Sequence, residues 1–187
     1  MDNLIIFASG AGTNAAAIIN WFKANGKARV SLIVCNKPQA GVLKIAEREN
    51  IPTLLIDKQS IQSTEFVATL QSHNPTLIVL AGFLWKIPAT MTTTFPDKII
   101  NIHPALLPKY GGKGMYGHHV HEAVIAAGEP ESGITIHYVN EAYDEGNTIV
   151  QAHCPVVAGD TPDSLAARIH QLEHYYFPRV IEFLLQH

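Results

Sequence analysis

Short apolar runs alternate with amphipathic segments through the first hundred residues of the chain. The apolar runs are rich in Val, Ile and Leu and lie at 4–8, 30–35, 53–56, 76–81 and 98–103. Helical patterns separate them at 13–24, 41–50 and 61–72, with a shorter helix after the fourth run. Near-continuous apolar strands are typical of sheets that helices bury on both faces. We therefore predict an α/β fold, doubly wound around a mostly parallel sheet.

The pattern changes in the second half of the chain. A helix is predicted at 117–127, and β-rich runs follow at 133–139 and 148–157. A short polar segment with a turn-forming Glu-Gly-Asn joins these two runs. Two β-rich runs around such a turn predict an antiparallel strand excursion near the C-terminus.

A long C-terminal helix is predicted to close the fold. Thr161 is suited to the N-cap and Pro162 to the first helical position, while Pro178 predicts a kink or a split farther along. The chain has no internal repeat, low-complexity stretch or linker. Its 187 residues are enough for one sizeable hydrophobic core and too few for two ordinary domains. We expect a single domain over residues 1–187.

Composition narrows the classes of function. Hydrophobic residues make up 47% of the chain and charged residues 16%, which favours a compact globular protein. The net charge is −3 and the 13 Lys and Arg form no basic run, which disfavours a nucleic-acid partner. No apolar run reaches the roughly 18 residues of a membrane span, and the N-terminus lacks the form of a signal peptide. We expect a cytoplasmic protein without a membrane partner, either a monomer or a homodimer.

Ser-Gly-Ala-Gly-Thr-Asn at 9–14 lies between the first predicted strand and helix. Amides at a helix N-terminus attract anions, and glycine allows a ligand to approach the backbone closely. One alternative is a tight turn that needs glycine for its own geometry. Another is a dinucleotide-binding Gly-x-Gly-x-x-Ala, which expects an acidic residue after the second strand. That strand ends in Cys35-Asn36-Lys37, so a phosphate-bearing substrate is favoured.

Asn101 and His103 stand two residues apart at the end of a predicted strand, so both project from one face. Pro104 ends the strand and leaves His103 at the edge of the sheet where α/β folds bind ligands. Histidine exchanges protons near neutral pH, and an asparagine amide donates to a developing oxyanion. The pair suits acyl transfer. The alternative is that Asn101 caps a loop and that His103 is an edge histidine whose hydrogen bonds are made within the protein.

Two further groups of polar residues are ambiguous by spacing alone. Asp144 is an ordinary turn aspartate unless its loop folds back to the strand end. His118, His119 and His121 suggest a metal site, but no Cys or Asp completes a ligand set. A solvated or substrate-facing histidine patch is favoured there. His137 is either a polar-face residue or a supporting active-site histidine.

Several segments together resemble the glycinamide ribonucleotide formyltransferases, a folate-dependent family. The loop at 9–14 looks like their phosphate loop, and Leu-Ala-Gly-Phe-Leu-Trp-Lys-Ile-Pro at 80–88 resembles their folate-side segment. Asn-Ile-His-Pro-Ala-Leu-Leu-Pro-Lys-Tyr at 101–110 resembles the signature of the wider formyltransferase family. The stretch 133–156 and Gln-Leu-Glu-His at 171–174 resemble the remainder of their active site. The similarity covers essentially the whole chain and implies a Rossmann-like formyltransferase fold.

The resemblance implies formyl transfer from the co-substrate 10-formyltetrahydrofolate, without a metal, to the amine of glycinamide ribonucleotide in purine biosynthesis. It implies that Asn101 and His103 flank the formyl carbonyl and that Asp144 supports His103. A carboxylate beside an imidazole favours its charged form, so we expect His103 to act as general acid. The residues implied for glycinamide ribonucleotide are Gly12, Thr13, Asn14, His170, Gln171, Leu172 and Glu173. Those implied for folate are Leu84, Trp85, Lys86, Ile87, Asn101, Asn140, Glu141, Ala142, Tyr143 and Asp144.

The chain departs from the family pattern at a few positions. Thr13 stands where Ser is usual, and Trp85-Lys86 replaces a frequent Arg-Ile, which leaves the pterin-side contacts open. The loop 111–119 is longer than in many bacterial members, and its four glycines suggest a mobile lid.

Three other functions remain as alternatives. Methionyl-tRNA formyltransferases share the Asn-x-His-Pro segment but add a C-terminal domain and a basic surface. Formyltetrahydrofolate deformylases add an N-terminal regulatory domain. Net negative charge disfavours the first of these, which binds tRNA. A sheet that begins at residue 4 disfavours the second. A phosphometabolite-binding protein or reductase without acyl chemistry is the alternative from another class.

Overall fold

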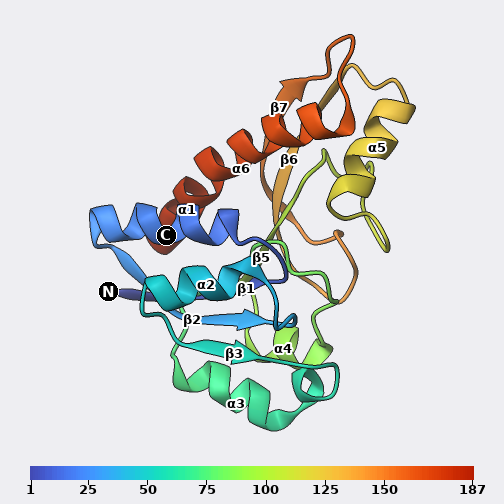
Figure 1. The fold of residues 1–187 in the computed structure, drawn as a ribbon. Helices are drawn as coiled ribbons and strands as arrows, with labels where there is room; N and C mark the ends of the chain where they lie inside the picture. Colours follow the sequence, from blue (N-terminus) through green and yellow to red (C-terminus); the bar gives the residue numbers. More distant parts are fainter.

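β1 (Asp2–Ala8) lies inside a seven-stranded sheet whose strand order is β3-β2-β1-β4-β5-β6-β7. The computed structural model describes residues 1–187 (Figure 1). The other strands are β2 (Ala28–Cys35), β3 (Thr53–Leu55), β4 (Leu77–Leu80), β5 (Ile99–His103), β6 (Glu131–Tyr138) and β7 (Thr148–Pro155). The first five strands pair in parallel, while β6 and β7 pair antiparallel. The predicted mostly parallel sheet with an antiparallel excursion is confirmed.

Helices cover both faces of this sheet (Figure 1). They are α1 (Thr13–Asn25), α2 (Gly41–Arg48), α3 (Thr64–Ser72), α4 (Ala89–Thr94), α5 (His118–Ala126) and α6 (Pro162–Leu185). Successive β1 side chains enter opposite cores: Leu4 and Ile6 pack on the side of α1 and α6, and Ile5 and Phe7 on the side of α3. This alternation is the two-residue period of a strand buried on both faces, which explains why its sequence is continuously apolar.

The region predicted as one helix at 61–72 is divided in the structure. A short 3₁₀ turn, η1 (Ser60–Gln62), precedes α3, and Ser63 separates the two. The Ser63 hydroxyl accepts a hydrogen bond from the Phe66 amide at 3.1 Å, which satisfies one free donor of the first helical turn. The N-cap serine therefore starts a new helix where hydrophobic spacing alone predicts continuity.

The long C-terminal helix α6 begins as predicted and runs through its internal proline. Thr161 and Ser164 form a reciprocal capping box, with Pro162 in the first turn. Pro178 lies inside the helix and does not split it. Both Phe177 and Pro178 are buried, so tertiary packing holds this stretch helical despite the missing amide donor. None of the helices in the structure has the length and apolar character needed to cross a membrane.

We expect Phe177→Ala to lower the free energy of unfolding by about 3–5 kcal/mol, because it opens a cavity where the ring is fully buried. Phe183→Ala is the matched control on the same helix, since the Phe183 side chain is 56% exposed. We expect that variant to stay within about 0.5 kcal/mol of the parent chain. Chemical denaturation followed by circular dichroism measures both values, and equal losses would contradict this account of the core.

Candidate active site

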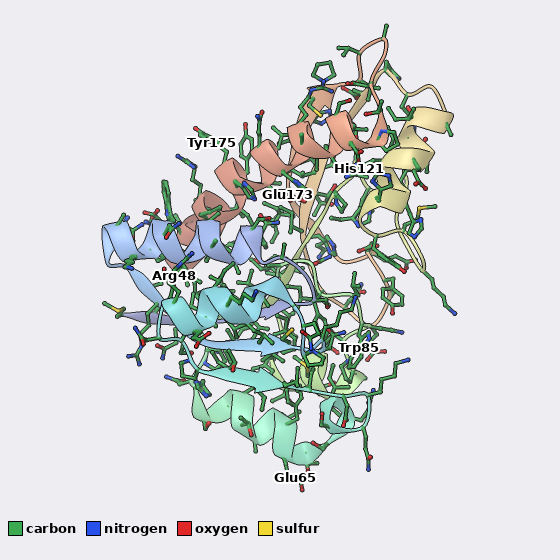
Figure 2. The ribbon with its side chains drawn as sticks, viewed as in Figure 1. Arg48, Glu65, Trp85, His121, Glu173 and Tyr175 are labelled. Carbon is green, nitrogen blue, oxygen red and sulfur yellow. The ribbon has the colours of Figure 1, made fainter.

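One cavity of about 910 Å³ opens where the order of the strands reverses around β1 and β4. Such a reversal separates the loops that follow two neighbouring strands and leaves a crevice at their carboxyl ends. The loop after β1, the segment after β4 and the end of β5 line this cavity. Trp85 from the segment after β4, His121 from α5 and Glu173 from α6 complete its wall (Figure 2).

The glycine loop after β1 leaves the N-terminus of α1 open to the cavity. Gly12 has φ of 80°, and a Cβ at this position would lie 2.8 Å from Val42 of α2. Glycine is therefore required both by backbone conformation and by the close approach of α2. No side chain caps α1, so amides of its first turn have no partner within the helix. Free amides and the helix dipole make this end a site for an anion.

Glu173 of α6 lies beside the same loop. Its Oε2 accepts a hydrogen bond of 3.0 Å from the side-chain amide of Asn14. Burial raises the pKa of the Glu173 carboxyl, and the Asn14 hydrogen bond only partly offsets this. The buried Oδ1 of Asn14 has no protein partner. The buried Glu173 of α6 and the half-buried Asn14 of α1 thus meet at the edge of the anion site.

Asn101 lies near the end of β5, and its amide is oriented by a histidine from the neighbouring strand. Asn101 Nδ2 is 3.2 Å from His137 Nε2, and His137 Nδ1 is 2.9 Å from the carbonyl oxygen of Tyr138. A carbonyl only accepts, so His137 Nδ1 donates to it. In the neutral ring Nε2 then accepts from Asn101. One amide N–H of Asn101 is fixed in this way, and the other stays free to donate.

His103, the last residue of β5, is buried and has an acceptor at each ring nitrogen. Nε2 donates to the carbonyl oxygen of Tyr110 at 2.6 Å, and Nδ1 lies 3.5 Å from Asp144 Oδ2. Burial lowers the pKa of His103, and the Asp144 carboxylate and the Tyr110 carbonyl only partly oppose this. Asp144 thus favours the charged form of His103, as expected, but desolvation has the larger effect on its pKa.

The loop that carries Asp144 folds back to the end of β5. Asp144 has a positive φ of 55°, and its Oδ2 accepts from the Gly112 amide at 3.0 Å. Its Oδ1 lies 3.7 Å from His137 Nε2. Burial alone would raise the pKa of Asp144, but His137, His103 and the Gly112 amide together lower it. The carboxylate is thus ionised between two histidines.

Most of the residues implied by the resemblance line this one cavity. They are Gly12, Thr13, Asn14, Leu84, Trp85, Lys86, Ile87, Asn101, His103, Asn140, Ala142, Tyr143, Asp144, His170 and Glu173. Three others do not line it. Glu141 and Gln171 are exposed, and Leu172 packs against the core. Because residues three apart share a face of a helix, α6 presents His170 and Glu173 to the cavity but not the two residues between them.

Further residues line the cavity that are not among those implied by the resemblance. They include Asp163 and Ala166 on α6, His118 and His121 on α5, and His137 on β6. The three-residue spacing of His118 and His121 is the available sequence signal, since it places both on one helix face. His118 lies 3.4 Å from Glu122 and 3.6 Å from Asp163. No group of three or more His, Cys, Asp or Glu is placed to hold a metal ion.

The fold and the site define the class of protein. A doubly wound α/β sheet carries, in one cavity, free helix amides for an anion and an Asn-His-Asp cluster suited to acyl transfer. The family model described as formyl transferase matches residues 2–181. The chain belongs to the formyl transferase family.

Relatives within this family resemble the chain over nearly its whole length. It is 38% identical over 191 residues to phosphoribosylglycinamide formyltransferase of Bacillus subtilis, covering 99% of this chain and 95% of that one. It is 40% identical to the chloroplastic enzyme of that name from Arabidopsis thaliana, covering 95% of this chain and 63% of the relative. The chain also spans 61% of the Vigna unguiculata relative. A solved phosphoribosylglycinamide formyltransferase from Anaplasma phagocytophilum superposes with a TM-score of 0.91 at 33% identity, covering 99% and 87% of the two chains.

We expect Asp144→Asn to lower the pKa of His103 further, because the carboxylate is the main group that opposes the effect of burial. Imidazole resonances followed by NMR during a pH titration measure this pKa. Glu141→Gln, an exposed acid in the same loop, is the matched control and should leave the His103 pKa unchanged. An unchanged or raised His103 pKa in Asp144→Asn would contradict the charge balance described above.

Proposed function

We propose that this chain transfers the formyl group of 10-formyltetrahydrofolate to the amine of glycinamide ribonucleotide. The products are formylglycinamide ribonucleotide and tetrahydrofolate, in purine biosynthesis. One observation carries the proposal: a single cavity joins an open helix N-terminus, an Asn-His-Asp cluster and an apolar segment. The helix N-terminus suits a phosphate, the Asn-His-Asp cluster suits a reacting carbonyl, and the apolar segment suits the flat aromatic ring of the formyl donor. The names of the family relatives favour the same acceptor.

The acceptor would bind at the glycine-loop end of the cavity. A phosphate there accepts from amides of the first turn of α1, and Gly12 lets it approach the backbone. Glu173 and Asn14, already hydrogen-bonded to each other, offer polar groups to the sugar and glycinamide part of the substrate. His170 lies on the same face of α6 as Glu173 and lines the same end.

The folate would bind at the opposite end. Leu84, Trp85 and Ile87 supply apolar surface, and Lys86 lies 6.0 Å from the centre of the Tyr143 ring. The polar loop 140–144 offers backbone groups to the pterin edge. Its last residue, Asp144, has Oδ2 at 3.5 Å from His103 Nδ1, so the loop lies against the catalytic cluster.

The chemistry follows from the groups between these two ends. The acceptor amine attacks the formyl carbon, and the carbonyl oxygen becomes an oxyanion. The free N–H of Asn101 and a protonated His103 would donate to that oxygen. As the intermediate collapses, the bond to the folate nitrogen breaks, that nitrogen takes a proton, and the former amine loses one. For its Nε2 to act on substrate, His103 must first release the Tyr110 carbonyl.

Asp144 would supply the charge that makes this role possible. Substrate excludes water from the site, which strengthens the attraction between the carboxylate and an imidazolium. His103 is held neutral by burial in the free protein and would take up its proton as negative charge develops beside it. The cytoplasmic location, the single domain and the choice between monomer and homodimer stay predictions from the sequence.

Purified protein mixed with 10-formyltetrahydrofolate and glycinamide ribonucleotide should release tetrahydrofolate only when both substrates are present. Release without the acceptor would instead indicate a deformylase, with water as the acceptor. Ligand binding without turnover would indicate a phosphometabolite-binding protein. A folded preparation that shows no acceptor-dependent release would refute the proposed function.

We expect His103→Ala to lower kcat/KM by about 10²–10⁴, the usual contribution of a positioned general acid. Asp144→Ala should lower turnover by about tenfold or more, because His103 loses its supporting charge. His153→Ala is the control, since His153 is exposed and lies outside the cavity. Circular dichroism checks that each variant is folded. A folded variant of either site residue with the parent rate would remove that residue from the mechanism.

A further inference from the structure

The turn that follows β5 contacts both His103 and Asp144. The Tyr110 carbonyl accepts a hydrogen bond from His103 Nε2 at 2.6 Å, and the Gly112 amide donates to Asp144 Oδ2 at 3.0 Å. Between these two residues, a Cβ added at Gly111 would lie 3.4 Å from Cβ of Asp144. The backbone of this turn is thus packed directly against the pair, so a shift of the turn would move both contacts.

Tyr110 has a strained backbone at the point where its carbonyl meets His103. Its φ is 55°, in the left-handed region that residues other than glycine adopt rarely. Such a conformation persists only where several surrounding contacts hold it in place. The direction of the Tyr110 carbonyl therefore depends on contacts beyond its own peptide group.

The Tyr110 side chain supplies such a contact. Its hydroxyl donates a hydrogen bond of 2.8 Å to Glu129 Oε1, and Lys109 Nζ lies 3.1 Å from the same oxygen. The partly buried ring packs against the hydrophobic core. Burial and the Glu129 carboxylate raise the pKa of the Tyr110 hydroxyl, so it keeps the proton that it donates. Tyr110 is thus held at its phenol as well as at its carbonyl.

The position of Glu129 is set by the junction of α5 and β6. Its amide donates to the Val124 carbonyl in the last turn of α5 at 3.4 Å, and β6 begins two residues later at Glu131. The Tyr110 hydroxyl and the Lys109 ammonium lower the pKa of the Glu129 carboxyl, so it is an ionised acceptor. Glu129 thereby ties the turn after β5 to two elements that come later in the chain.

Tyr110 and Glu129 lie outside the large cavity that His103 lines. With Lys109 they line a separate cavity of about 290 Å³. Neither side chain is therefore placed to touch a substrate bound beside His103. Any effect that they have on the reaction must pass through the Tyr110 carbonyl to the His103 ring.

The Tyr110 carbonyl decides which ring nitrogen of neutral His103 carries the proton. A carbonyl only accepts, so the proton is on Nε2, and the bare Nδ1 lies 3.5 Å from Asp144 Oδ2. If the carbonyl moved away, the carboxylate would be the better acceptor and the proton would move to Nδ1. Two acceptors thus compete for one proton, and the position of the carbonyl settles the competition.

We propose that Tyr110 and Glu129 are positioning residues for His103. Their hydrogen bond holds the Tyr110 carbonyl where it keeps the proton on Nε2, until a substrate oxygen replaces the carbonyl as acceptor. The catalytic part of this role rests on the proposed function, in which Nε2 donates to the oxyanion. The site thereby extends to two residues that do not line its cavity.

Other titratable groups also face His103. Asp144 raises the pKa of His103 and His137 of β6 lowers it, while His103 in turn lowers the pKa of His121 on α5. Glu129 is not among the groups that shift the pKa of His103. An effect of Glu129 on the His103 ring would therefore come from position and not from charge, which a neutral replacement can test.

NMR of the ligand-free protein with ¹⁵N-labelled histidine tests the proposal, because protonated and bare ring nitrogens have well separated shifts. At about pH 8 His103 is neutral, since its pKa lies below the usual value of about 6.5. Its signals are the ones that are missing from His103→Ala. The parent chain should show the proton on Nε2, and Tyr110→Phe and Glu129→Ala should show it mostly on Nδ1. The His103 pKa should also fall in both variants, because the Tyr110 carbonyl raises it.

Two matched variants separate position from charge. Glu129→Gln keeps an oxygen that accepts from the phenol, so it should restore the proton to Nε2. Lys109→Met removes the ion pair and leaves the phenol–carboxylate bond, so it should match the parent. Thermal melting checks folding, and Tyr110→Phe, which keeps the ring, carries the test if Glu129→Ala is unfolded. A proton on Nδ1 in the parent, or on Nε2 in folded Tyr110→Phe, would overturn the proposal.

Turnover with 10-formyltetrahydrofolate and glycinamide ribonucleotide gives the second readout. In Tyr110→Phe we expect kcat to fall about tenfold, less than the 10²–10³ that loss of an oxyanion donor costs. KM should stay within about twofold, because the side chain lies outside the cavity. An unchanged kcat would overturn the catalytic role. A higher kcat would also overturn it, because the carbonyl would then only compete with the substrate for His103.

Failure of the positioning role is distinguishable from failure of the proposed function, because the NMR measurement needs no substrate. A proton that moves from Nε2 to Nδ1 in Tyr110→Phe, in a protein that does not transfer formyl groups, would count against the proposed function alone. Formyl transfer by a parent chain whose His103 tautomer is the same in Tyr110→Phe would count against the positioning role alone.

Discussion

The antiparallel register of β5 and β6 is the constraint on which the rest of the site depends. It sets Asn101 opposite His137 and His103 opposite Thr135. A slip of one residue would turn every one of these side chains to the other face of the sheet. Farther along β6, Gly133 lies so close to Ala152 of β7 that an added Cβ would be 2.0 Å from its carbonyl oxygen. This close approach leaves no room for a side chain, and so it helps to hold the paired strands in one register.

Thr135 then fixes the turn that follows β5. Its hydroxyl donates to the Ala105 carbonyl at 2.7 Å and accepts from the Leu107 amide at 3.0 Å. The chain after His103 is thereby directed toward Tyr110, whose carbonyl holds the ring of His103. The pairing of β5 with β6 thus decides the orientation of both Asn101 and His103, although β6 lies about thirty residues farther along the chain.

Burial controls the charge states in this cavity. His103, His121 and Glu173 are all buried, and in each case desolvation shifts the pKa toward the neutral form. Asp144 is the exception, because hydrogen bonds and neighbouring histidines outweigh its burial. The site therefore holds the ionised carboxylate of Asp144 beside groups whose burial favours their neutral forms. Such an arrangement suits the arrival of an anionic substrate and of a developing oxyanion.

The sequence by itself determined the elements, because strand and helix periods, caps and glycine turns are local signals. It also determined the glycine loop and the Asn101-His103 pair, since both follow directly from the ends of strands. Only the tertiary structure decided that Asp144 reaches His103, that Gln171 and Leu172 turn away while His170 and Glu173 face the cavity, and that burial keeps His103 neutral. These outcomes depend on contacts and desolvation between segments far apart in the chain, which no local pattern encodes.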